Sequence, residues 1–139
     1  MISSLTGIVK SSNATSAIIE IGGVGMLVQM PAKSVANLTI GKNASIYTSL
    51  VVREDSLTLF GFETAAARDL FETLQTVTGI GPKVSQSALS IFEPEELVEA
   101  IATGDNSLLE RIPGLGKKGA QRVIIDLKEK VGSVKRSSK

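Results

Sequence analysis

The amino-acid sequence predicts an α+β chain of two domains, a small five-stranded β-barrel followed by an all-α domain. The first observation is a change of hydrophobic period: short alternating or β-branched runs extend to Phe62, and apolar residues at helical spacing follow. The second is a 35-residue internal repeat confined to the later part. We therefore expect a barrel domain over residues 1–63, a helical domain over 64–131 and a flexible basic tail over 132–139.

Five short runs predict the strands of the barrel. They fall at residues 1–10, 17–21, 26–30, 44–52 and 57–62. The stretch "GGVG" (Gly22–Gly25) is typical of a hairpin turn between two of these runs. "PAKSVANL" favours a helical turn and "TIGKN" a loop. Five strands with one small helical insertion are typical of an OB-type barrel.

Helical spacing begins after Glu63, where we place the domain boundary. The apolar positions of the expected helix faces are Leu70, Phe71, Leu74 and Val77 in the first segment, and Leu97, Val98 and Ile101 in a later one. The later helix opens with Pro94 and acidic residues, which suit a helix start. Asp105 is expected to cap the short helix that follows.

The composition excludes several kinds of site. The 139-residue chain is 42% hydrophobic and 21% charged, as in ordinary globular domains. It contains no Cys and no His, so disulfides, zinc sites and Ser-His-Asp triads cannot form. It has no apolar run of about eighteen residues and no signal-peptide pattern at its start. We expect a cytoplasmic protein without a membrane segment, a metal or another cofactor.

The basic charge is concentrated near the end of the chain. The net charge is only +1 overall, but residues 106–139 hold nine basic and three acidic residues, a local excess of +6. Such a skew suggests a polyanionic partner. A solvated helix face followed by a basic tail explains the charge equally well at this point.

An internal repeat occupies the helical part. Leu74–Leu89, "LQTVTGIGPKVSQSAL", aligns with Leu109–Ile124, "LERIPGLGKKGAQRVI", 35 positions later. In each copy a Gly-x-Gly with an apolar middle residue is followed, two positions on, by a lysine. The matching positions are Gly79, Gly81 and Lys83 in the first copy, and Gly114, Gly116 and Lys118 in the second. Two linked copies are expected to bury a shared core.

Each copy predicts a helix, a tight glycine turn and a second helix. The turn would expose backbone N–H groups at a helix N-terminus, where the helix dipole also favours an anion. Lys117 and Lys118 fall in the first turn of such a helix, which disfavours cations unless a negative partner lies nearby. Arg122 lies four residues after Lys118, on the same face. The pattern predicts two hairpins that hold phosphates without reading bases. The alternative is that one hairpin only packs.

Two adjacent carboxylates stand out in the barrel half. Glu54 and Asp55 occupy the turn between two predicted strands in "VVREDSLTLFGF" (Val51–Phe62). An ordinary polar hairpin loop explains them most simply. A carboxylate pair is also compatible with metal binding, with acid–base chemistry or with repulsion of phosphates. Because there is no His and no third acidic residue nearby in sequence, we do not expect catalysis here.

The order of these motifs resembles the RuvA family of bacterial Holliday-junction-binding proteins. The five-stranded barrel, "VVREDSLTLFGF", "VTGIGPK" and "IPGLGKKGAQR" follow one another between Met1 and Val131, nearly the whole chain. The resemblance implies a homotetramer that holds a four-way DNA junction open, with paired helix-hairpin-helix motifs on the phosphates of each arm. The DNA-binding residues that it implies are Gly79, Gly81, Lys83, Gly114, Gly116, Lys117, Lys118 and Arg122. It also implies that Glu54 and Asp55 form an acidic pin, which repels phosphates at the junction centre.

The same resemblance implies partners and shows one departure. RuvA-like proteins have no ATPase of their own; they load the motor RuvB, which drives branch migration in recombination and repair, and work beside the resolvase RuvC. The family has a third helical domain that contacts the motor, and this chain ends at Lys139 without it. We therefore expect this polypeptide to bind junctions and not to engage RuvB.

Two other functions stay open beside this one. The first is a helix-hairpin-helix DNA repair enzyme, a glycosylase or a nuclease. Its candidate catalytic residues would be Lys83 with Asp105, or Glu54 with Asp55. The second is a non-catalytic interaction scaffold.

The barrel is not expected to bind single strands. Its only aromatic residues are Tyr47, Phe60 and Phe62, without a basic groove beside them. Phe60 and Phe62 share one strand face, which favours core or interface packing. We assign the barrel to assembly and to presenting the acidic turn.

Overall fold

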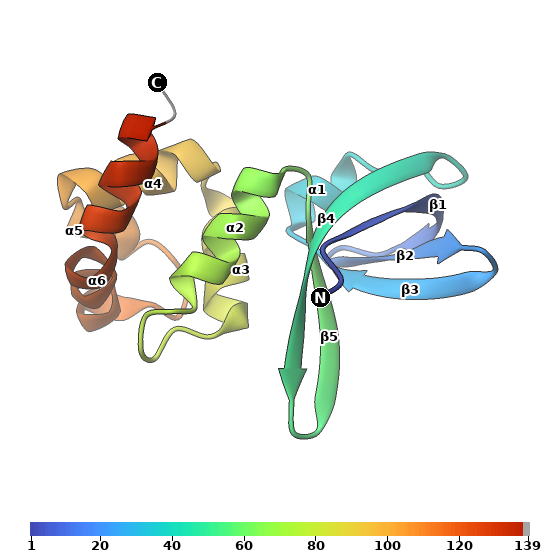
Figure 1. Cartoon of the computed structure of the whole chain (residues 1–139), viewed down its shortest axis with the longest axis horizontal. Helices are drawn as coiled ribbons and strands as arrows, with labels where there is room; N and C mark the ends of the chain where they lie inside the picture. Colours follow the sequence, from blue (N-terminus) through green and yellow to red (C-terminus); the bar gives the residue numbers. More distant parts are fainter. Residues whose placement is uncertain (138–139) are drawn as a thin grey trace. The chain divides into compact units, whose positions relative to one another are not determined.

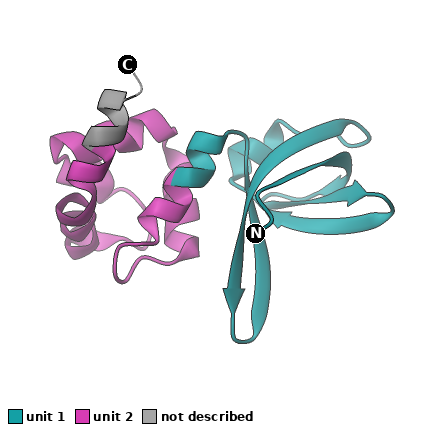
Figure 2. Ribbon diagram, viewed as in Figure 1, with its two compact units in different colours: residues 1–69 teal, residues 70–139 magenta. Residues whose placement is uncertain are grey.

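The computed structural model describes residues 1–137, and it describes side chains as far as Val131. The chain divides into two compact units, Met1–Asp69 and Leu70–Lys139 (Figure 2). The division falls inside helix α2 (Ala65–Leu74), shortly after the boundary near Glu63 that the change of period suggests. Among the described residues, no helix is both long enough and apolar enough to cross a membrane.

The first unit is a closed five-stranded barrel, which confirms the predicted fold class. Its strands are β1 (Ser4–Ser12), β2 (Ser16–Ile21), β3 (Val24–Gln29), β4 (Asn43–Arg53) and β5 (Ser56–Phe62), with helix α1 (Ala32–Ala36) between β3 and β4 (Figure 1). The strands are hydrogen-bonded in the order β1-β2-β3-β5-β4. Neighbouring strands are antiparallel except β3 and β5, whose short parallel pairing closes the barrel. Closure pairs the strand edges within the barrel itself.

Side chains that alternate along the strands fill the barrel interior. The buried core consists of Leu5, Val9, Ala17, Ile19, Val28, Met30, Val35, Ile46 and Leu59. The interior is so tight that one wall position must be glycine: a Cβ on Gly61 would lie 2.7 Å from Ile46 Cγ2 and clash with Val28. Phe60 and Phe62 project from the opposite face of β5 and are also buried, as core or interface packing requires.

The predicted turns of the barrel are confirmed by their backbone angles. Gly22 and Gly23 have φ of 57° and 86°, which suits a two-residue hairpin turn between β2 and β3. Gly41, with φ of 88°, lies in the predicted loop before β4. The ribbon of β4 and β5 continues beyond the rest of the barrel and ends at the acidic turn (Figure 1).

Arg68 anchors the start of α2 to the barrel. Its Nη1 donates a hydrogen bond to the backbone oxygen of Ser3 at 2.8 Å. The guanidinium lies over the ring of Tyr47, 5.6 Å from the ring centroid, and pairs with Asp69 at 3.0 Å. The ring of Tyr47 is therefore covered by a cation of its own chain on that face, which leaves it poorly suited to stacking on a base.

The second unit is helical. After α2 come α3 (Pro82–Ile91), α4 (Pro94–Thr103), α5 (Asn106–Leu109) and α6 (Gly116–Ser137). The predicted apolar faces are buried, with Val98 only half-buried and with Val77 in the turn after α2. Asp105 caps α5, as expected: its carboxylate accepts a hydrogen bond from the N–H of Leu108 at 3.1 Å.

The last helix is longer than the apolar pattern indicates. α6 continues to Ser137, past Val131, where the hydrophobic spacing ends. The predicted flexible tail, 132–139, therefore overlaps the helix. Its side chains and residues 138–139 lie outside the described residues, so the tail stays a prediction.

Candidate nucleic-acid interface

Two glycine turns form the candidate interface. Gly79 and Gly114 each have a left-handed backbone, with φ of 89° and 84°, which only glycine adopts at little cost. The turns then differ: Gly81 is extended, with φ of −100°, whereas Gly116 is left-handed, with φ of 72°. α3 follows the first turn and α6 the second, so each turn ends at a helix N-terminus, as predicted.

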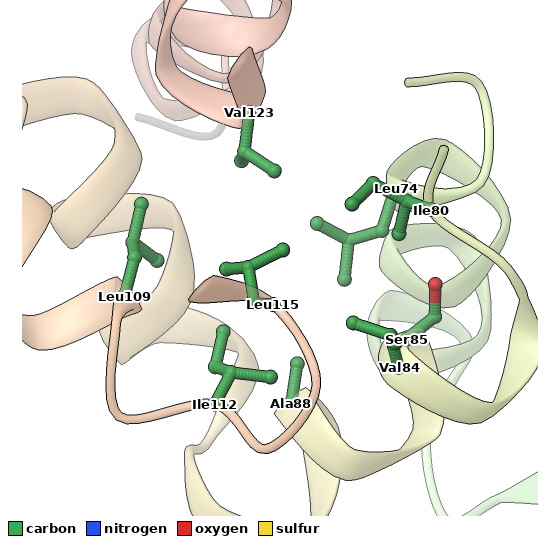
Figure 3. A pocket seen from close by; sticks show the side chains of 9 residues that line it. All are labelled: Leu74, Ile80, Val84, Ser85, Ala88, Leu109, Ile112, Leu115 and Val123. Atoms are coloured by element: carbon green, nitrogen blue, oxygen red, sulfur yellow. The ribbon is translucent and has the colours of Figure 1, made fainter. Parts of the chain in front are cut away.

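The middle residues of both turns point into one apolar space. Ile80 and Leu115 both line a cavity of about 10 Å³ (Figure 3), room for about one water molecule. The cavity is lined by Leu74, Ile80, Val84, Ser85, Ala88, Leu109, Ile112, Leu115 and Val123. Several of these are partners in the 35-residue repeat, such as Leu74 and Leu109. The repeat copies bury a shared core, as the sequence predicts.

The second turn also lies close to a side chain that follows the first turn. A Cβ added to Gly114 would lie 3.2 Å from Cγ2 of Val84, in the first turn of α3. The second glycine turn therefore rests against the helix that begins at the first. This contact and the shared apolar core tie the two turns to each other.

Four cations stand exposed beside the turns. Lys83 lies in the first turn of α3, Lys117 and Lys118 lie in the first turn of α6, and Arg122 follows one turn later. Within the described part of the chain, none of the four forms an ion pair. Another basic residue of the region, Arg111, is engaged, because its guanidinium lies 5.5 Å from the centroid of the Phe92 ring.

The helix N-termini at the glycine turns differ from the others in this unit. α4 has an acidic first turn and a capping box, in which Glu93 and Glu96 bond each other's backbone N–H groups. α5 has the Asp105 cap. By contrast, α3 has no side-chain cap, and neither α3 nor α6 has an acidic residue in its first turn. The helix dipole and the free N–H groups there are available to an external anion.

The two turns are unequal in charge and in donors. The first has a single lysine, Lys83, and Pro82 at its first helical position removes an N–H group. The second turn has Lys117 in place of Pro82 and Lys118 in place of Lys83. It also has Arg122 where the first copy of the repeat has Ser87. The second turn therefore offers the stronger anion site.

Ser85 supports the first turn and was missed by the sequence reasoning. Its side chain is fully buried, and its hydroxyl donates a hydrogen bond to the backbone oxygen of Gly81 at 3.0 Å. The repeat offered a signal, because a polar residue stands here where the second copy has the buried Ala120.

Glu54 and Asp55 lie at the tip of the β4–β5 ribbon, in the barrel unit. Both are exposed, and no hydrogen bond or ion pair engages either side chain within residues 1–131. The described residues contain no group of three or more acidic side chains arranged to hold a metal ion. The geometry leaves two uncompensated negative charges at an outer turn.

Comparison with known proteins accounts for both units. The family model described as the RuvA N terminal domain matches residues 1–61, and that of the SAM-like helix-hairpin-helix tandem matches residues 71–129. Relatives named Holliday junction branch migration complex subunit RuvA include those of Salinispora arenicola and Thermobifida fusca. The first is 47% identical over 134 residues, covering 96% of this chain and 67% of that protein. The second is 51% identical over 132 residues, covering 95% and 65%.

A third relative of the same name, from Bifidobacterium adolescentis, is 52% identical over 128 residues, or 92% of this chain and 62% of that protein. The chain thus spans about two thirds of the length of the relatives it matches. Together, the two family models cover the closed barrel with its acidic ribbon tip and the two glycine turns on one core. The chain belongs to the RuvA family.

Proposed function

We propose that this chain binds four-way DNA junctions through their backbone phosphates and holds them open for branch migration. The observation that carries the proposal is the pair of glycine turns on one core, each ending at a helix N-terminus with exposed cations and no acidic first turn. Two anion sites on one core suit two backbone phosphates of a duplex arm. The relatives' name, which specifies a Holliday junction complex, supports the same substrate.

Each residue has a role in this proposal. The glycines Gly79, Gly81, Gly114 and Gly116 let a sugar–phosphate chain approach the backbone, and Lys83, Lys117, Lys118 and Arg122 supply the neutralising charge. Glu54 and Asp55 act as the acidic pin, because exposed carboxylates repel phosphates and so keep the strands apart at the junction centre.

The proposed assembly is a homotetramer that matches the four arms of the junction. Selectivity would then come from four-fold geometry, because phosphate contacts alone do not distinguish sequences. The motor RuvB and the resolvase RuvC are the proposed partners of the complex; the relatives' name, a subunit of a branch migration complex, supports the first.

The proposed role is non-catalytic. Asp105, a candidate partner for a lysine nucleophile, already caps α5. Glu54 and Asp55 are two carboxylates without a third ligand group among the described residues. A repair enzyme or a scaffold therefore has no observation in its favour here. Incubation with Mg²⁺ and abasic, nicked and branched substrates tests the point, and any cleavage would contradict it.

Electrophoretic mobility shifts with a four-way junction and a linear duplex of equal length test the function. We expect preference for the junction and a steep loss of affinity with salt. The double variant Lys83→Glu, Lys118→Glu should lose junction binding, whereas Lys42→Glu, a charge reversal in an exposed barrel loop, should not. Equal affinity for both DNA forms would refute the proposal.

A further inference from the structure

The β4–β5 ribbon has an apolar face beside the acidic turn. Val52 and Leu57 are directly opposite each other in the two strands. The next pair on the same face lies two positions nearer the barrel along each strand and consists of Leu50 and Leu59. Both of these side chains pack into the barrel core. The apolar row therefore continues out of the barrel and becomes exposed: Val52 is 61% and Leu57 73% accessible.

The opposite face of the ribbon tip is polar. Arg53 pairs with Ser56 across the strands, next to the Val52–Leu57 pair and pointing to the other side. Glu54 and Asp55 form the turn that joins Arg53 to Ser56. The tip thus has an apolar face, a cationic face and an acidic end within the six residues from Val52 to Leu57.

We propose that Val52 and Leu57 form an apolar wedge that contacts the base pairs at the junction centre. This rests on the proposed function, which places the acidic turn there. Carboxylates repel phosphates but not the uncharged faces of bases, so an apolar pair beside them selects bases over backbone. Aliphatic side chains inserted between base steps unstack the bases in DNA-bending proteins. Arg53, on the other face, is placed to take the displaced phosphates.

A second copy of the chain is the less suitable occupant. Two ribbons that packed directly on each other through their apolar faces would bring the Glu54–Asp55 pairs of both copies closer together than acidic turns separated by DNA at a junction centre, and like charges at such close range oppose that contact. A nucleobase brings no charge to the same surface.

The test uses a four-way junction with 2-aminopurine at the crossover, because this base brightens when it leaves the stack. We expect the wild-type protein to raise its emission and to shield it from acrylamide. The variant Val52→Thr, Leu57→Thr keeps strand-forming side chains and removes apolar surface. It should lose most of the emission increase while keeping junction affinity within about twofold, because phosphate contacts supply the affinity.

Three controls separate the possible outcomes. Leu27→Thr changes another exposed leucine, 54% accessible on β3, and should behave as wild type. Val52→Ile, Leu57→Met keeps the apolar surface and should retain the emission even if the threonine variant folds poorly. A probe placed well inside one arm should not respond to any variant.

Wild-type emission from the threonine variant at normal affinity would overturn the wedge. So would a fall in the mass of the free threonine variant, because the pair would then be a contact between copies. Absence of any preference of the wild-type protein for junctions would instead reject the proposed function, and with it the wedge.

Discussion

The unequal charge of the two glycine turns leads to a quantitative prediction about salt. The second turn presents Lys117, Lys118 and Arg122, whereas the first presents only Lys83. Each cation that neutralises one phosphate contributes about 0.9 to the slope of log affinity against log salt concentration. Replacing the three cations by Gln should therefore reduce the slope by about 2.7 per bound protomer, and Lys83→Gln by about 0.9.

The ratio of the two effects is the decisive quantity, because it is independent of how many protomers bind. Fluorescence anisotropy with a labelled four-way junction, between 50 and 200 mM KCl, is the assay. Over this fourfold range the wild-type protein should lose roughly 40-fold more affinity per bound protomer than the triple Gln variant. Lys42→Gln, in an exposed barrel loop, serves as the matched control and should leave the slope unchanged.

Equal slope changes for the two turns, or a larger one for Lys83→Gln, would refute the charge argument. That result would mean that the backbone N–H groups of both turns, rather than their side chains, set the strength of each contact. Gln is a suitable replacement because its helix propensity is close to that of Lys and Arg, so the helices themselves should be retained.

The remaining predictions concern stability. Leu115→Ala should cost about 2–5 kcal/mol of unfolding free energy in urea titration, because it enlarges the cavity between the turns; a loss below about 1 kcal/mol would contradict the shared core. Gly61→Ala should cost about 1–3 kcal/mol by the same measurement, because its methyl group would overlap Ile46 and Val28, and a neutral result would mean that the barrel wall yields. Asp105→Ala should lower stability by about 1 kcal/mol through the lost cap and leave junction affinity intact; reduced affinity would implicate Asp105 in DNA contact.

Much of the fold could be predicted because the signals are local. The period of two in the strands and the helical spacing after Glu63 located the barrel and the helices. Asp105 was placed as a cap by its position before a short helix. The repeat predicted the shared core, since equivalent positions such as Ile80 and Leu115 must bury equivalent side chains.

Features that depend on distant residues could not be predicted in this way. The need for glycine at Gly61 comes from Val28 and Ile46, which precede it by many residues. The contact of Arg68 with Ser3 and Tyr47 likewise spans most of the barrel sequence. Such contacts follow from the closure of the sheet and leave no periodic signal.

The site residues stay predictions; the sequence showed that the second turn has more cations, but it did not show that the two turns differ in backbone conformation. Matched glycines and lysines suggested two similar turns, whereas Gly81 and Gly116 have different backbone conformations. The exposure of Val52 and Leu57 was also missed, because alternation along a strand does not show where the barrel ends and the ribbon continues alone.

Ile80 and Leu115 belong to the shared core beneath the two glycine turns. This core separates the packing that positions the turns from the surface charge that the turns present. The two glycine turns that we propose as phosphate sites rest on interior side chains, which substitutions of solvent-facing residues do not touch. A substitution of an exposed cation at either turn should therefore change the charge offered to a phosphate and leave the packing beneath the turns intact.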